Sequence, residues 1–184
     1  MPSSSRKCLL VGLVVFLAWE FPRQAVGQAP RASPIQPASL REMTRNAGYI
    51  FTGKVLAVQR EAVTRSNTVP TIRITFRVQQ AIRGVHRGQT LLIREWAGRW
   101  ESGDRYRPGE PVLLFLYPPS KLGLTSAIGG ASGHFAIDGS GQIVLADERI
   151  ASLALEPSRQ AVWREKGRIS SREFADAIRH MSEE

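Results

Sequence analysis

The chain has 184 residues, of which 42% are apolar and 22% charged, a balance that supports one domain with a packed core and excludes wholesale disorder. Its 25 lysines and arginines outnumber its 16 acidic residues, giving a formal net charge of +9. One cysteine and three histidines exclude a disulfide-stapled fold and a multi-cysteine zinc site, so we expect no metal and no cofactor.

Residues 1–27 have the pattern of a secretory leader. A basic start precedes an apolar run over residues 8–19, and small residues lead up to a cleavage site at Gly27. The run is shorter than the roughly 20 residues that a membrane-spanning helix needs. We therefore expect cleavage near Gly27, export to the periplasm or the medium, and no stable transmembrane span afterwards. An uncleaved membrane anchor is the alternative.

Residues 28–38 contain three prolines and no periodicity, which predicts a flexible linker. Ser39 is typical of a helix N-cap, and apolar residues recur at helical spacing from Leu40 to Ala47. A short amphipathic helix is therefore expected to end at Gly48.

From residue 49 the apolar period changes to two, which indicates strands. The expected strands cover residues 49–58, 72–82, 90–96, 112–117, 134–138 and 142–145. Gly53 predicts a bulge in the first strand. Apolar residues alternate with arginine, threonine and glutamine over residues 72–82, so this strand should have one buried and one basic face. The unbroken apolar run at residues 112–117 predicts a strand that is buried on both faces.

The C-terminal part is polar and weakly patterned over residues 147–168, where Pro157 interrupts it. Ser170 and Glu173 then fit a capping box, and apolar residues on one face predict a helix over residues 171–182. The expected organisation is a barrel domain with its leading helix at residues 39–146, followed by a C-terminal extension at residues 147–184.

No strand–helix–strand alternation is present, so a parallel sheet is not expected. The pattern instead predicts a mainly β fold with a short N-terminal helix and a C-terminal helix. Its centre would be a closed or partly closed OB-like barrel of about five to six antiparallel strands.

Three segments between residues 49 and 115 share a pattern with a known family. They are the opening strand Tyr49-Ile50-Phe51-Thr52-Gly53-Lys54-Val55, the strand over residues 72–82 that ends at Arg83-Gly84, and residues 103–115, which are similar to a G-x-x-Y-L-L-F segment. They resemble netrin-like domains, which include tissue inhibitors of metalloproteinases and cysteine-free bacterial relatives. The resemblance implies an OB-like five-stranded barrel. The animal inhibitors depend on disulfides and an N-terminal cysteine, which the expected mature chain lacks, so protease inhibition does not carry over.

Arginines and aromatic residues gather around the loop after the third expected strand. Aromatic faces stack on bases or sugars, and guanidinium groups pair with phosphate, sulfate or carboxylate. The candidate ligand-binding residues are Arg73, Arg77, Arg94, Trp96, Arg99, Trp100, Arg105, Tyr106 and Arg107. In the alternative interpretation, Trp96 and Trp100 plug the barrel end, while the arginines pair with Glu95, Glu101 and Asp104.

Two other groups suggest chemistry but also fit simpler roles. Ser126 and Ser132 precede His134 in a glycine-rich segment, which suggests a small hydrolase. The segment Gly130-Ala131-Ser132-Gly133 does not fit the G-x-S-x-G motif of a nucleophile elbow, because Ser132 is one place late. A loop over the barrel mouth explains the segment better. Asp138, Asp147 and Glu148 suggest a cation site, yet the spacing of a calcium loop is missing and a β-turn explains Asp138.

These observations favour an exported, non-enzymatic domain that binds another component of the bacterial envelope or secretome, either a protein or an anionic polymer. The first alternative is a binder of an acidic glycan or nucleic acid through the arginine–tryptophan loop. The second is a small hydrolase. The sequence indicates neither a specific ligand nor an oligomeric state.

Overall fold

The computed structural model describes residues 38–63, 69–101 and 106–183. These residues belong to one of two units of the chain, residues 36–184. The predicted leader and the predicted linker up to residue 37 lie outside the described residues. No helix in the described part is both long enough and apolar enough to cross a membrane.

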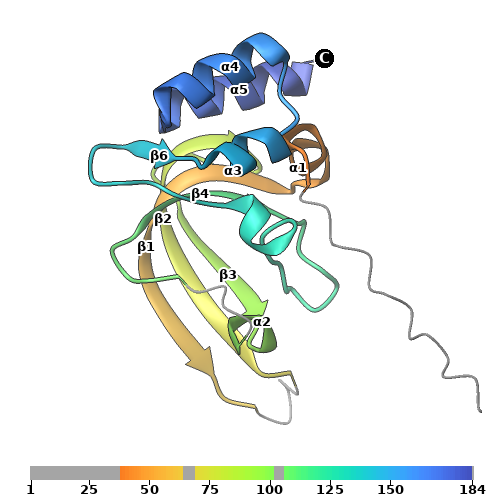
Figure 1. Ribbon diagram of the computed structural model, residues 1–184. Helices are drawn as coiled ribbons and strands as arrows, with labels where there is room; N and C mark the ends of the chain where they lie inside the picture. The colour runs from red at the N-terminus through yellow and green to blue at the C-terminus, as the bar shows by residue number, and fades with distance from the viewer. Residues whose placement is uncertain (1–37, 64–68, 102–105, 184) are drawn as a thin grey trace, which may run out of the picture. The chain divides into compact units, whose positions relative to one another are not determined.

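The described residues form seven strands and several short helices (Figure 1). The strands are β1 (Tyr49–Glu61), β2 (Thr71–Arg83), β3 (Thr90–Trp96), β4 (Pro111–Leu116), β5 (His134–Ala136), β6 (Gln142–Val144) and β7 (Arg168–Ser170). The helices are α1 (Leu40–Asn46), α2 (Gly98–Glu101), the 3₁₀ turn η1 (Gly130–Gly133), α3 (Asp147–Ser152), α4 (Pro157–Lys166) and α5 (Ser171–Glu183). The predicted mainly β fold with a helix near each end is confirmed.

The main sheet has five antiparallel strands in the order β3-β2-β1-β4-β5, and β6 and β7 form a second, two-stranded sheet. The five-stranded sheet is not closed into a barrel. The chain leaves β5 after three residues, and β6 then pairs with β7 instead of continuing along β4. A loop partly bridges the opening, because the Thr125 amide donates to the Arg94 carbonyl of β3 at 2.9 Å.

The sheet separates two apolar clusters, and β4 contributes to both. Val112, Leu114 and Leu116 face the first cluster, which lies inside the curved sheet and is called the inner core here. Leu113 and Phe115 face the second, which lies against the helices and is called the helix-side core. All five side chains are fully buried, so the prediction of a strand buried on both faces is confirmed.

Capping interactions define the starts of the first and last helices. The Ser39 hydroxyl accepts a hydrogen bond from the Glu42 amide at 3.2 Å, and the Glu42 carboxylate accepts one from the Ser39 amide at 2.9 Å. At the start of α5, the Glu173 amide donates to the Ser170 hydroxyl at 3.1 Å. Both helix starts predicted from the sequence are confirmed.

The weakly patterned stretch before α5 contains α3, α4 and β7, which the sequence did not predict. Pro157, expected to interrupt this stretch, is the first residue of α4, where its missing amide hydrogen costs nothing. Leu145 and Ile150 enter the same helix-side core, so residues on both sides of position 146 share one core. The expected tight hairpin around residues 139–141 is present, since Ile137 and Ile143 form an antiparallel bridge and the Asp138 amide donates to the Gln142 carbonyl at 2.8 Å, although β5 and β6 join different sheets.

A bulge between β1 and β2 changes the expected face of one residue. Thr52 pairs with Gln80 and Gly53 pairs with Val78, so Gln79 is the extra residue. The bulge that Gly53 predicted is therefore present, with its extra residue on the partner strand. Strict alternation places Ile82 on the same face as Val78, but the bulge shifts the alternation and Ile82 packs against the helix-side core.

Candidate functional site

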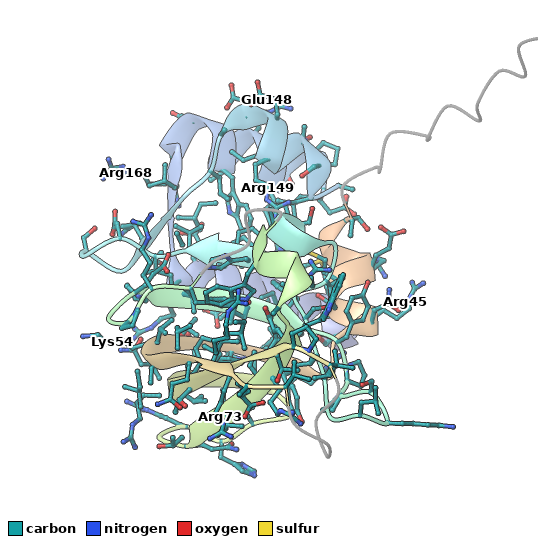
Figure 2. All side chains as sticks on the ribbon, turned by 90° about the horizontal axis from the view of Figure 1, so that it is seen from below. Arg45, Lys54, Arg73, Glu148, Arg149 and Arg168 are labelled. Carbon is teal, nitrogen blue, oxygen red and sulfur yellow. The ribbon has the colours of Figure 1, made fainter. Side chains whose placement is uncertain are left out.

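The basic face predicted for residues 72–82 lies on the side of β2 and β3 that is turned away from the inner core. Ile72, Ile74, Phe76 and Val78 are buried on the inner side, whereas the residues between them point outward. We call this surface the outer face. It comprises Arg73, Thr75, Arg77, Leu92, Arg94 and Trp96. Figure 2 shows Arg73 on this part of the sheet, on the side of the view opposite Glu148.

Two arginines of the outer face share one carboxylate. Arg73 lies directly opposite Arg94 in the β2–β3 pairing. The Arg94 Nε donates to Glu61 Oε2 at 2.7 Å, and the Arg73 Nε donates to Glu61 Oε1 at 2.8 Å. Thr71 adds a hydroxyl hydrogen bond to Oε2 at 2.7 Å. Hydrogen bonds from Thr71 and Arg94 lower the pKa of the Glu61 carboxyl from 4.5 to about 2, so it is ionised at neutral pH. The cluster keeps one net positive charge.

The two tryptophans of the candidate loop point in different directions. The side chain of Trp96 is 52% exposed on the outer face, where its ring lies so close to Gly98 that any side chain there would overlap it. Trp100 instead packs against the inner core, and its indole nitrogen donates to Glu95 at 3.3 Å. The alternative interpretation, in which both tryptophans plug the end of the barrel, therefore fits Trp100 and is wrong for Trp96.

A buried carboxylate organises the inner end of the loop. Glu95 is 2% exposed and accepts a hydrogen bond from the Tyr106 hydroxyl at 3.3 Å, in addition to that from Trp100. The Tyr106 ring packs edge-on against Phe76 at 5.5 Å. Because an ionisable group inside a core needs polar partners, Trp100 and Tyr106 have a structural role here.

The nine candidate residues therefore divide into separate groups. The outer face holds Arg73, Arg77, Arg94 and Trp96. Trp100 and Tyr106 belong to the inner core, Arg99 is half-buried on α2, and Arg107 is exposed in the turn before β4. Arg105 lies outside the described residues, as do Asp104 and the side chain of Glu101.

The acid that pairs with the outer-face arginines was not predicted. The sequence suggested nearby acids in the loop after β3, but Glu61 comes from the end of β1. Its position could have been found from the antiparallel pairing, which sets Glu61 opposite Thr71. The expected first strand ended three residues too early, at residue 58, and so excluded Glu61.

The remaining candidates are explained by local packing. The ring of His134 packs against Tyr106 at 5.1 Å, and the Ser132 carbonyl accepts a hydrogen bond from Arg149. The Arg149 guanidinium lies 4.5 Å above the Phe135 ring, and burial lowers its pKa. Figure 2 shows Arg149 among other side chains, in contrast to the outward-pointing Arg45 and Arg168.

Asp138 closes a turn. Its Oδ1 accepts hydrogen bonds from the Ser140 hydroxyl at 2.7 Å and from the Ser140 and Gln142 amides at 2.9 Å each, and these bonds lower its pKa. Within the described ranges, no three histidine, cysteine, aspartate or glutamate side chains gather as metal ligands would.

We compared the chain with known protein families, curated proteins and solved structures. No family model, no curated protein and no solved structure matches the chain. The likeness to netrin-like domains thus stays a prediction from the sequence.

Proposed function

We propose that the chain is an exported, non-enzymatic binding module whose outer face binds an acidic glycan. The observation that carries this proposal is the pair formed by Arg73 and Arg94, which lie opposite each other on β2 and β3 and share the Glu61 carboxylate. Like charges directly opposite each other destabilise a sheet. An additional anion supplied by a ligand would offset the remaining repulsion.

The arginines are held in place before any ligand arrives. Glu61 orients Arg73 and Arg94, and the Arg77 guanidinium donates to the Gly88 carbonyl at 3.0 Å. Arg73 and Arg77 are four residues apart on one strand, a separation of about 13 Å at the usual rise per residue. Such spacing suits a polymer that presents several anionic groups, and fixed side chains lose less entropy when they bind.

Exposed apolar side chains beside the arginines support a glycan as the polymer. Trp96 and Leu92 are 52% and 51% exposed on the outer face. An indole ring can stack on the apolar face of a sugar while guanidinium groups pair with carboxylate or sulfate substituents. The expected export to the cell envelope agrees with such a partner.

The chemistry of the outer face favours binding over catalysis. Its acid, Glu61, has a pKa of about 2 and is engaged by two arginines. General acid–base catalysis works best with a group whose pKa lies near the working pH. Glu61 is suited to charge pairing instead.

The test is salt-dependent retention on immobilised heparin, an acidic glycan. The double variant Arg73→Gln/Arg77→Gln is compared with Arg45→Gln/Arg164→Gln, which removes the same charge from exposed positions on α1 and α4. We expect the outer-face variant to elute at lower salt, with the slope of log K against log salt reduced by about 2. The control variant should stay close to the wild type.

Equal elution of the two variants would contradict the proposal, because non-specific charge attraction depends on net charge alone. Tighter retention on single-stranded DNA than on heparin would replace the glycan with nucleic acid. Thermal unfolding by circular dichroism confirms that each variant is folded before its elution is interpreted.

A further inference from the structure

A second group of arginines lines a groove between α5 and the neighbouring strands β1 and β2. The groove has a volume of about 510 Å³. Its polar walls come from three parts of the chain: Thr52, Gln79, Gln80, Arg87, Arg172 and Arg179. It shares no residue with the outer face, so its ligand is independent of the proposed function.

The groove is strongly cationic. Arg172 and Arg179 are seven residues apart on α5, which places them two helical turns apart on one side of the helix. Arg87 approaches from the turn between β2 and β3. No acidic residue belongs to the lining of this groove as far as the structure describes the chain. Asp176 pairs with Arg179 at 2.5 Å and lines the adjoining cleft between α4 and α5, to which Arg172 also belongs.

Most of the polar side chains in the groove have no partner in the protein. The side chains of Thr52, Gln79, Gln80, Arg87 and Arg172 make no hydrogen bond or ion pair with any other residue of the described part of the chain. Thr52 is 4% exposed as a residue, and its hydroxyl oxygen opens to the groove instead of being sealed in the core. Gln79 and Arg87 are exposed to solvent, so their hydrogen-bonding groups are available to a ligand in the groove.

The bulge at Gln79 contributes to this arrangement. Regular alternation would point Gln79 and Gln80 to opposite faces of β2, but both side chains line the groove because Gln79 is the extra residue. The bulge therefore directs two amide groups into one site, next to the Thr52 hydroxyl. Bulges commonly redirect side chains in this way near binding sites.

We infer that this groove binds the phosphate or sulfate monoester of a sugar-sized molecule. Guanidinium groups from Arg87, Arg172 and Arg179 would surround the tetrahedral oxyanion, for which paired N–H donors are well suited. The Gln79 and Gln80 amides can each donate and accept, as sugar hydroxyls require. The volume lies within the range of small-molecule sites.

The experiment titrates the full chain with glucose 6-phosphate, glucose 6-sulfate, glucose and inorganic phosphate, using isothermal calorimetry and amide chemical shifts. We expect at least one ester to bind with a Kd below about 1 mM, and the tighter ester identifies the oxyanion. Glucose and inorganic phosphate should each bind more weakly than that ester. The changes in amide chemical shift on binding should centre on residues 79–80 of β2 and on the start of α5.

Variants locate the site. Arg87→Gln and Arg172→Gln should each raise the Kd of the tighter-binding ester by about tenfold or more, since each removes a charged hydrogen-bond donor. Arg164→Gln, on the exposed side of α4, and Arg73→Gln/Arg77→Gln should leave the affinity unchanged. Thr52→Val keeps the shape of the side chain and should weaken binding through loss of the hydroxyl.

Three results would overturn the inference. The first is no binding of either ester in the millimolar range by a folded chain. The second is equal weakening by Arg164→Gln and Arg172→Gln, which would indicate general charge attraction. The third is inorganic phosphate binding as tightly as the esters, which would exclude a role for the sugar. Loss of ester binding with heparin retention intact separates this site from the outer face.

Discussion

The two ends of β2 differ in what lies against their outer side. Near its C-terminal end, Ile82 packs against the helix-side core and α5 closes over the strand. Near its N-terminal end, Arg73 and its neighbour Arg94 are partly exposed, with side-chain exposures of 45% and 30%, and both pair with Glu61. Figure 1 shows β1, β2 and β3 extending away from the helices, with α2 near the tip of β3.

The proposed function depends on exposed arginines, and their exposure follows from how far the helices cover the sheet. Where helices cover the outer side, the residues there are apolar, such as Leu113 and Phe115 of β4. Where the covering ends, arginines and polar residues begin, and the proposed phosphate or sulfate site lies at the boundary between the two. The helix layer carries stability, while the bare part of the sheet leaves charged side chains available.

The largest effect is expected in the helix layer. Trp163 of α4 is 1% exposed and stacks on Phe174 of α5 with ring centroids 5.2 Å apart. Trp163→Ala should lower the free energy of unfolding by about 3–5 kcal/mol, because it leaves a large cavity. Val162→Ala, on the exposed side of the same helix, should change it by less than about 0.5 kcal/mol. Urea denaturation measures both, and similar values would show that α4 is not part of the core.

A smaller effect is expected in the inner core below the bare end of the sheet. Tyr106→Phe keeps the ring but removes one hydrogen bond to the buried Glu95, so it should cost about 1–3 kcal/mol. Trp96→Phe, on the outer face, serves as the matched aromatic change and should cost little. If Trp96→Phe proved the more costly of the two in urea denaturation, the assignment of these residues to opposite faces would be wrong.

The smallest effect is a pH dependence at the outer face. The pKa of Glu61 is about 2 in the folded chain and 4.5 ordinarily, so the unfolded chain binds the proton more readily. The stability contributed by Glu61 is therefore complete above about pH 4.5 and is lost as the pH falls towards 2. Glu61→Gln should be less stable than the wild type at pH 7 and should lose less stability on acidification.

The measurement is the Tm between pH 7 and pH 2. Glu148→Gln, an exposed change on α3, is the control and should follow the wild-type curve. Parallel curves for wild type and Glu61→Gln would show that Glu61 is not held by Arg73 and Arg94 in solution.

Some features of this protein could be predicted because the signal lay within a few neighbouring residues. The bounds of β3 agree with the expected residues 90–96, and Ser39 caps α1 as expected. At α5 the Ser170 half of the expected capping box is present, while the Glu173 carboxylate pairs with Lys166. The burial of β4 on both faces follows from its unbroken apolar run. In each case, local sequence and tertiary environment favour the same structure.

Other features could not be predicted from the sequence because they depend on distant residues. The helices α3 and α4 are six and ten residues long, too short to be stable alone, so packing against the core must select them. The arginine–tryptophan loop forms one cluster in the sequence. In the folded chain, Glu95 holds Trp100 and Tyr106 inside, while Trp96 stays outside.

The amino-acid sequence alone determined a mainly β chain with capped terminal helices and one strand of alternating apolar and basic residues, because periodicity and capping are local properties. The tertiary structure decided which arginines share a carboxylate, which aromatic residues stay exposed and which polar groups meet in the groove under α5. Those outcomes depend on strand register, on the bulges in the β1–β2 pairing and on the extent of the helix layer. All three arise from contacts between residues far apart in the chain.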